Sequence, residues 1–90
     1  MIRKRFLVQG KVQGVGFRFF CQMTAKSLNN LTGFAKNLNN GDVLIEVQGP
    51  YEKIIEFRYL ISKGNKFCSI SNIFEEELTL IPKEKKFFIQ

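Results

Sequence analysis

The chain changes its hydrophobic period within one stretch, RFLVQGKVQGVGFR at residues 5–18. From Arg5 to Val12 the side chains alternate between two faces, as in a half-buried strand, with Phe6, Val8, Gly10 and Val12 on one of them. After the glycines at positions 14 and 16 the apolar spacing becomes helical, through Phe17, Phe20, Cys21, Thr24, Ala25 and Leu28. The stretch therefore predicts a strand, a tight loop and a helix that begins near Arg18.

The rest of the chain predicts five further elements. The first helix ends around Asn29-Asn30, because asparagine accepts the left-handed cap conformation. Strands are predicted at Gly33–Leu38 and Val43–Gln48, and the Asn-Gly pair of Asn39-Asn40-Gly41 supplies the positive φ angles of a tight hairpin. A second helix is predicted over Tyr51–Lys63, with Ile54, Phe57 and Ile61 inward and Gly64 beyond its end. The last predictions are a long strand within Ser69–Ile81, with Ile70, Phe74, Leu78 and Leu80 on one face, and a short edge strand at Lys86–Ile89.

This order is the βαββαβ arrangement of an α+β, ferredoxin-like sandwich, in which two helices cover one face of an antiparallel sheet. We expect one domain over residues 1–90, with the extra edge strand at its C-terminus. Right-handed crossovers make the first two strands parallel, with the third between them. The loop at Gln13–Phe17 and the side chain of Asn37 should therefore meet at the same edge of the sheet.

Composition excludes several kinds of chemistry. The 90 residues contain no histidine and a single aspartate, Asp42, so Ser-His and Cys-His catalysis, paired aspartates and the usual zinc sites are ruled out. Two widely spaced cysteines, Cys21 and Cys68, suit a reduced cytosol, and the short apolar run after the basic N-terminus is no export signal. We expect a cytoplasmic monomer without a membrane segment, a metal or a cofactor.

Charge is distributed unevenly along the chain. Residues 1–41 carry seven Lys and Arg and no acid, whereas residues 42–90 carry seven cations and eight anions. A positive field of this kind attracts phosphates or nucleic acid without distinguishing between them.

The loop that carries the two glycines is suited to binding an anion. Glycines let successive main-chain N–H groups converge on one point, and the N-terminus of the following helix adds partial positive charge. Arg18 contributes a planar, permanently charged fork that can hold two oxygens of a phosphoryl group. A bare G-x-G is weak evidence, but its strand-to-helix context and the one-sided charge strengthen it.

Two stretches resemble the signatures of the acylphosphatase family. They are Gly10-Lys11-Val12-Gln13-Gly14-Val15-Gly16-Phe17-Arg18, and Thr32-Gly33-Phe34-Ala35-Lys36-Asn37 with the following Asn40-Gly41-Asp42-Val43. The resemblance implies hydrolysis of a small-molecule acyl phosphate to a carboxylate and phosphate. It implies that Arg18 binds the phosphoryl group, that Asn37 positions the attacking water, and that the main-chain amides of Gly14, Val15, Gly16, Phe17 and Arg18 surround the phosphate.

Residue chemistry agrees with this implication. An acyl phosphate releases a carboxylate whose conjugate acid has a pKa of about 4, so no protein acid needs to protonate it. Phe34 stands where the family commonly has tryptophan, and Asn30 where it commonly has glycine. Neither departure touches the expected chemistry.

Two other functions are compatible with the pattern. The chain could be a non-catalytic phosphate- or RNA-binding module, since ferredoxin-like sheets with exposed aromatic residues bind RNA. It lacks an aromatic-rich RNA-binding signature, and we interpret Phe19 and Phe20 as core residues because of their helical setting. It could also be a regulatory or maturation domain that binds carbamoyl phosphate within a larger complex, as the related N-terminal domains of hydrogenase-maturation proteins suggest.

Overall fold

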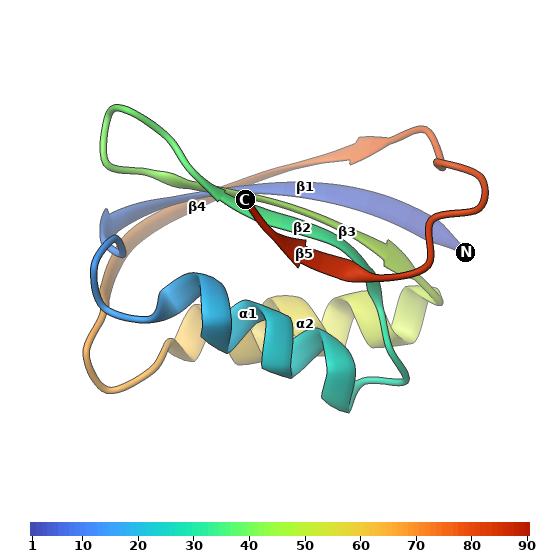
Figure 1. Ribbon diagram of the computed structural model, residues 1–90, viewed down its shortest axis with the longest axis horizontal. Coiled ribbons are helices and arrows are strands. Elements are labelled where there is room, and N and C mark those ends of the chain that lie inside the picture. Colours follow the sequence, from blue (N-terminus) through green and yellow to red (C-terminus); the bar gives the residue numbers. More distant parts are fainter.

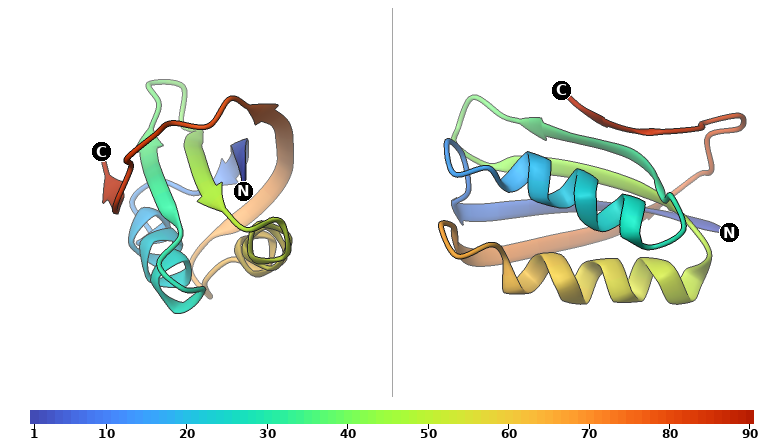
Figure 2. Two further views of the ribbon diagram at one scale, coloured as in Figure 1. Left: turned by 90° about the vertical axis from the view of Figure 1, so that its right-hand side faces the viewer. Right: turned by 60° about the horizontal axis from the view of Figure 1, so that its bottom comes forward.

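Seven elements follow one another in the computed structural model, which describes all 90 residues. They are β1 (Ile2–Lys11), α1 (Phe17–Ser27), β2 (Thr32–Asn37), β3 (Val43–Gly49), α2 (Tyr51–Lys63), β4 (Ser69–Leu78) and β5 (Phe87–Ile89). Both helices lie on one face of a single sheet, and the other face is open (Figures 1 and 2). The predicted ferredoxin-like architecture is confirmed. No helix has the length and apolar character needed to cross a membrane.

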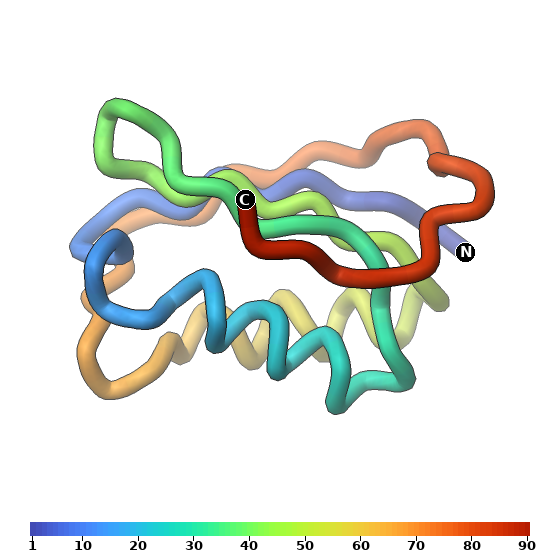
Figure 3. The backbone as a smooth tube through the Cα atoms, viewed as in Figure 1, coloured from blue at the N-terminus to red at the C-terminus, as the bar shows by residue number.

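The sheet has the strand order β4-β1-β3-β2-β5. β3 is antiparallel to both β1 and β2, so these two strands are parallel to each other, as the right-handed crossovers predict. The edge strand β5 pairs with β2 in parallel, so the complete sheet is mixed rather than antiparallel. The loop that follows β1 and the β2–β3 hairpin consequently lie at the same end of the molecule (Figure 3).

The core lies between the sheet and the helices. Sixteen buried apolar residues form one cluster, which includes Phe6 and Val8 from β1, Phe17 and Cys21 from α1 and Phe57 from α2. The ring centroid of Phe57 is 6.4 Å from that of Phe6 and 6.2 Å from that of Phe87, so the centre of the core is largely aromatic. The inward positions predicted for both helices are confirmed.

Two sequence predictions of local structure were wrong in detail. The pairing of β1 with β4 shifts register after Gln9, and this irregularity leaves Ser71 without a partner. An extra residue in a strand moves every later side chain to the opposite face of the sheet. Ile73 therefore packs against the core, as Ile70 does, and Phe74, which was predicted to share a face with Ile70, is exposed on the open face. The hairpin takes its positive φ at Gly41 alone and uses a longer turn, in which the N–H of Leu38 donates to the carbonyl of Asp42 at 2.9 Å.

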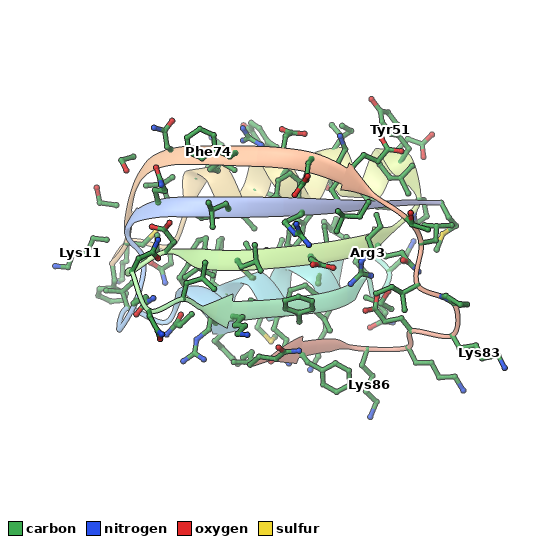
Figure 4. The ribbon with its side chains drawn as sticks, turned by 90° about the horizontal axis from the view of Figure 1, so that it is seen from above. Arg3, Lys11, Tyr51, Phe74, Lys83 and Lys86 are labelled. Atoms are coloured by element: carbon green, nitrogen blue, oxygen red, sulfur yellow. The ribbon has the colours of Figure 1, made fainter.

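The open face carries a buried arginine. Arg3 is only 1% exposed and donates to Glu46 at 2.9 Å, to Gln48 at 3.2 Å and, through both terminal nitrogens, to Glu84 at 2.8 and 3.2 Å. Gln48 also exchanges two hydrogen bonds with the main chain of Ile81. These contacts fasten residues 79–86, here called the C-terminal strap, across one end of the sheet (Figure 4).

Candidate active site

A pocket of about 160 Å³ opens where the β1–α1 loop meets the end of β2. The lining contains no acidic side chain and is formed by Val12, Gly14, Gly16, Phe17, Arg18, Phe19, Asn37 and Ile89. Two larger hollows, on the open sheet face and beside the C-terminal half of α1, contain neither Arg18 nor Asn37. The smallest hollow is therefore the one that brings together the two side chains that the sequence predicts to be catalytic.

The loop between β1 and α1 presents free main-chain donors. Gly14 and Gly16 have φ angles of +73° and +75°, a left-handed conformation that glycine adopts without strain. Gly16 is the N-cap of α1 and supplies no side-chain cap, so the first N–H groups of the helix have no capping partner. The N–H groups of Gly14, Val15 and Gly16 donate to no protein acceptor. The result is a run of amides that an anion could satisfy.

A contact from behind fixes the orientation of this loop. The side-chain nitrogen of Asn65, in the α2–β4 connection, donates to the carbonyl of Val15 at 2.8 Å. Asn65 also accepts from the N–H groups of Phe67 and Cys68, at 3.0 and 2.9 Å. The Val15 carbonyl therefore accepts its hydrogen bond outside the pocket. This contact keeps the Val15 oxygen away from the place where an anion would bind.

Arg18 lies in the first turn of α1 and borders the pocket. Its Nη1 donates to the main-chain oxygen of Gln90 at 2.6 Å, and it forms no ion pair. In contrast, three of the four cations of β1 (Arg3, Lys4 and Arg5) are paired with glutamates, and Lys11 is not. Much of the positive charge of β1 is thus paired with glutamates, whereas the guanidinium of Arg18 has no carboxylate side chain as a partner.

Asn37 is the last residue of β2 and also borders the pocket. Its Oδ1 is buried and has no hydrogen-bond partner, and it is the one buried side-chain nitrogen or oxygen in the structure in that state. A buried carbonyl oxygen without a donor costs roughly 1–3 kcal/mol. The Oδ1 atom of Asn37 is therefore available to accept a hydrogen bond from a bound water or substrate.

Gln13 holds these two parts of the site together. Its side-chain nitrogen donates to the carbonyl of Leu38 at 2.7 Å and to that of Asp42 at 2.9 Å. The loop that contains the free amides is thereby tied to the turn directly after Asn37. The sequence analysis placed Gln13 in the loop and assigned it no role. Its amide side chain, next to Gly14, is the one feature that could have indicated a hydrogen bond to a neighbouring turn.

The structure brings most of the sequence-predicted site residues around one pocket. Gly14, Gly16, Phe17, Arg18 and Asn37 all line it, and Val15 lies in the loop without contributing to the lining. Three lining residues, Val12, Phe19 and Ile89, were missed. The prediction that Phe19 packs in the core is wrong, because its side chain is 60% exposed, whereas Phe20 does pack against the core.

Cys21 lies one turn after Phe17 and has a different environment. Its side chain is fully buried in the core, and this burial, with a smaller effect from Cys68, raises the pKa of the thiol far above its ordinary range. A thiol held neutral is a poor nucleophile. Cys21 is therefore a packing residue.

The sequence model of the acylphosphatase family matches residues 4–89. The chain belongs to the acylphosphatase family. It is 55% identical over 87 residues to a protein of Clostridium perfringens named acylphosphatase, and the match covers 97% of each chain. Its structure is similar to the crystal structure of an acylphosphatase from Bacillus subtilis, with a TM-score of 0.94, 34% identity and coverage of 100% of this chain and 99% of that one.

A larger protein contains a similar domain. Full-length HypF in its phosphate- and nucleotide-bound form matches all of this chain, with a TM-score of 0.81 and 32% identity, but the match covers 12% of HypF. The acylphosphatase fold thus occurs both in proteins of this length and within a larger one.

Proposed function

We propose that the chain hydrolyses acyl phosphates to a carboxylate and inorganic phosphate, with the phosphoryl group bound in the pocket beside Arg18 and Asn37. Membership of the acylphosphatase family supports this activity, as does similarity over nearly the full length of a relative that bears that name. The non-catalytic phosphate- or RNA-binding alternative is not favoured by these relatives.

The phosphoryl group is placed against the β1–α1 loop. The amides of Gly14, Val15, Gly16, Phe17 and Arg18 and the guanidinium of Arg18 would surround its oxygens, because these amides have no protein acceptor and the guanidinium donates only one hydrogen bond, to Gln90. The transition state of phosphoryl transfer is loose and anionic. Fixed donors and dipoles that already point at the anion stabilise it without reorganising during the reaction.

The observation that carries the mechanism is the unpartnered Oδ1 of Asn37. A water molecule in the pocket would donate a hydrogen to this oxygen and direct a lone pair at phosphorus. A carboxamide can orient water in this way without changing its own protonation state. Asn37 is therefore assigned to positioning the nucleophile.

The leaving group needs no acid from the protein. The carboxylate that departs is already a stable anion near neutral pH, since its conjugate acid has a pKa of about 4. The pocket has no titrating carboxylate or imidazole, which suits this reaction and would suit the hydrolysis of an ordinary phosphate ester poorly. The mechanism as proposed requires no metal and no cofactor.

Phosphate release from benzoyl phosphate and acetyl phosphate tests the proposal. Arg18→Ala and Asn37→Ala should each lower kcat/KM by about 10²–10³-fold, the range for removing one preorganised donor or positioning group. Arg58→Ala and Asn39→Ala are matched controls, because both residues lie outside the pocket, and they should retain activity. Full activity of Asn37→Ala would refute the role assigned to this residue.

The metal-free mechanism has its own test. Turnover of the wild-type protein should be the same after dialysis against a chelator as before. A loss of activity that returns on adding one divalent metal would refute this part of the proposal.

We also propose that the protein acts as a cytoplasmic monomer and does not depend on nucleic acid. The two free thiols support a reducing compartment. Both helices pack one face into a single hydrophobic core, which supports a fold that is stable without a partner. Light scattering at assay concentration should give the mass of one chain. A stable dimer, or activity that requires RNA, would contradict this proposal.

A further inference from the structure

The pocket has two side chains that the proposed mechanism does not use. Two of its lining residues are glycines, and the side chains of Val12 and Phe17 are almost completely buried. The mechanism assigns Arg18 to the phosphate and Asn37 to the water. The remaining two are Phe19 and Ile89. They reach the pocket from different elements, Phe19 from α1 and Ile89 from β5.

Both side chains are apolar and open to solvent. Phe19 is 60% exposed and Ile89 is 40% exposed, although most other apolar residues of α1 are at least partly buried. Exposed apolar surface in this pocket gains free energy when an apolar group covers it. The two residues thus offer a contact surface directly beside the place where the phosphoryl group is expected.

The chemistry of the substrate determines what can reach that surface. In an acyl phosphate the acyl carbon is bonded to the bridging oxygen of the phosphoryl group, so the acyl group must sit immediately outside the phosphate cradle. It must also leave on the side of phosphorus away from the attacking water. Because no lining residue is acidic, a positively charged acyl group would find no counter-charge in the pocket.

We infer that Phe19 and Ile89 bind the acyl group, and that the preferred substrates are acyl phosphates with an aromatic or branched apolar acyl group. This inference rests on the proposed function and adds the class of substrate to it. Phe19 is the main determinant, because a ring provides a large, rigid contact area at low entropic cost.

Comparing two substrates isolates this contact. Benzoyl phosphate has an aromatic acyl group that can cover Phe19, whereas the methyl group of acetyl phosphate is too small to do so. Phe19→Ala should lower kcat/KM for benzoyl phosphate about tenfold and for acetyl phosphate less than about twofold, the scale on which apolar pockets discriminate. Phe19→Leu should recover part of the loss, and inhibition by inorganic phosphate should not change.

Met23 provides the matched control. It lies one turn beyond Phe19 on α1 and is 46% exposed, but it does not line the pocket. Met23→Ala should leave both substrates unaffected. Ile89→Ala should lower the preference for benzoyl phosphate in the same direction as Phe19→Ala.

The outcomes separate the inference from the function on which it rests. An equal loss on both substrates in Phe19→Ala, or no loss on either, would overturn the acyl-binding role while leaving acyl phosphate hydrolysis intact. A folded wild-type protein that hydrolyses neither substrate would instead overturn the proposed function and, with it, this inference.

Discussion

The side-chain amide of Gln13 lies 2.7 Å from the carbonyl oxygen of Leu38, 25 residues further along the chain. A second bond from the same nitrogen, 2.9 Å long, reaches the carbonyl of Asp42 at the far side of the turn. One side chain therefore spans the base of the β2–β3 hairpin from the β1–α1 loop. Beside the pairing of Asn37 with Val43 in the sheet, this link is a direct contact between the loop of free amides and the turn after Asn37.

Gln13→Ala should lower kcat more than it raises KM. Removing both bonds frees the hairpin end that carries Asn37, whereas the amides of the loop and Arg18 can still bind the phosphoryl group. We expect a fall in kcat of roughly tenfold, since small misplacements of a positioning group are costly. Gln9→Ala, which removes only a 3.5 Å contact with Asp42, is the control. Equal kcat values in Gln13→Ala and the wild type would show that the hairpin end is held by other contacts.

Substitutions of Gly14 should act through backbone conformation. A Cβ atom there would meet nothing within 4 Å, but φ is +73°. Gly14→Val should weaken inhibition by inorganic phosphate and destabilise the fold by about 1–2 kcal/mol, because branched residues resist the left-handed region. Gly14→Asn should retain more of both properties, since asparagine tolerates that region. Similar values for the two variants would exclude backbone strain as the cause.

Arg3→Ala should destabilise the protein strongly. It would leave the nearly buried carboxylate of Glu84 without a cation and that of Glu46 with Arg5 as its only one, and breaking a buried pair costs about 3–5 kcal/mol in comparable cases. Arg3→Lys should be intermediate, because an ammonium cannot reproduce the fork that spans both glutamates. Urea unfolding measures these differences, with the surface pair Arg58–Glu75 as a reference expected to contribute less than about 1 kcal/mol. A loss for Arg3→Ala no larger than this reference would mean that the strap is held by other contacts.

Burial of Cys21 should make stability fall in alkaline solution. Its pKa is raised in the folded state, so above about pH 9 the unfolded chain loses a proton that the folded protein keeps. The free energy of unfolding should therefore decrease with rising pH, by up to about 1.4 kcal/mol per pH unit from this group. Cys21→Ala should show a shallower decrease than the wild type, and Cys68→Ala should keep the wild-type slope. Parallel curves for all three proteins would rule out the buried thiol as the cause.

Turnover should depend little on pH near neutrality. No side chain that lines the pocket titrates between about pH 6 and 8, and Asn37 acts without gaining or losing a proton. We expect kcat for benzoyl phosphate to vary less than about twofold across this range. A bell-shaped profile would reveal a general acid or base that the proposed mechanism lacks.

The sequence was sufficient for the fold where a pattern was local. Period changes located both helices, and the bounds of α2 match the predicted Tyr51–Lys63. The positive φ angles of Asn29 and Asn30 occur at the predicted end of α1. The face of β4 could not be predicted, because the bulge at Ser71 arises from pairing with β1, which the sequence of β4 alone does not encode. The parallel pairing of β5 likewise depends on the path of the C-terminal strap.

The site was predictable to the extent that one loop encodes it. Two glycines before an arginine indicated the cradle, and the crossover rule placed Asn37 beside it. The exposure of Phe19 agrees with the helical pattern, because the apolar stripe of α1 includes Phe20 and not Phe19; interpreting both rings as core residues overlooked this difference. Ile89 and Gln90 reach the site only through β5, which contacts β2 and α1 far earlier in the sequence, and no local pattern reveals such a contact.

The hydrogen bond between Arg18 and the main chain of Gln90 affects how tightly a substrate can bind. A free arginine side chain samples many rotamers, and fixing it when a ligand arrives lowers affinity through lost entropy. Here one N–H of the guanidinium is already anchored at 2.6 Å, while the others remain available. This bond restricts the rotamers of Arg18 before a substrate arrives, so less side-chain entropy remains to be lost on binding.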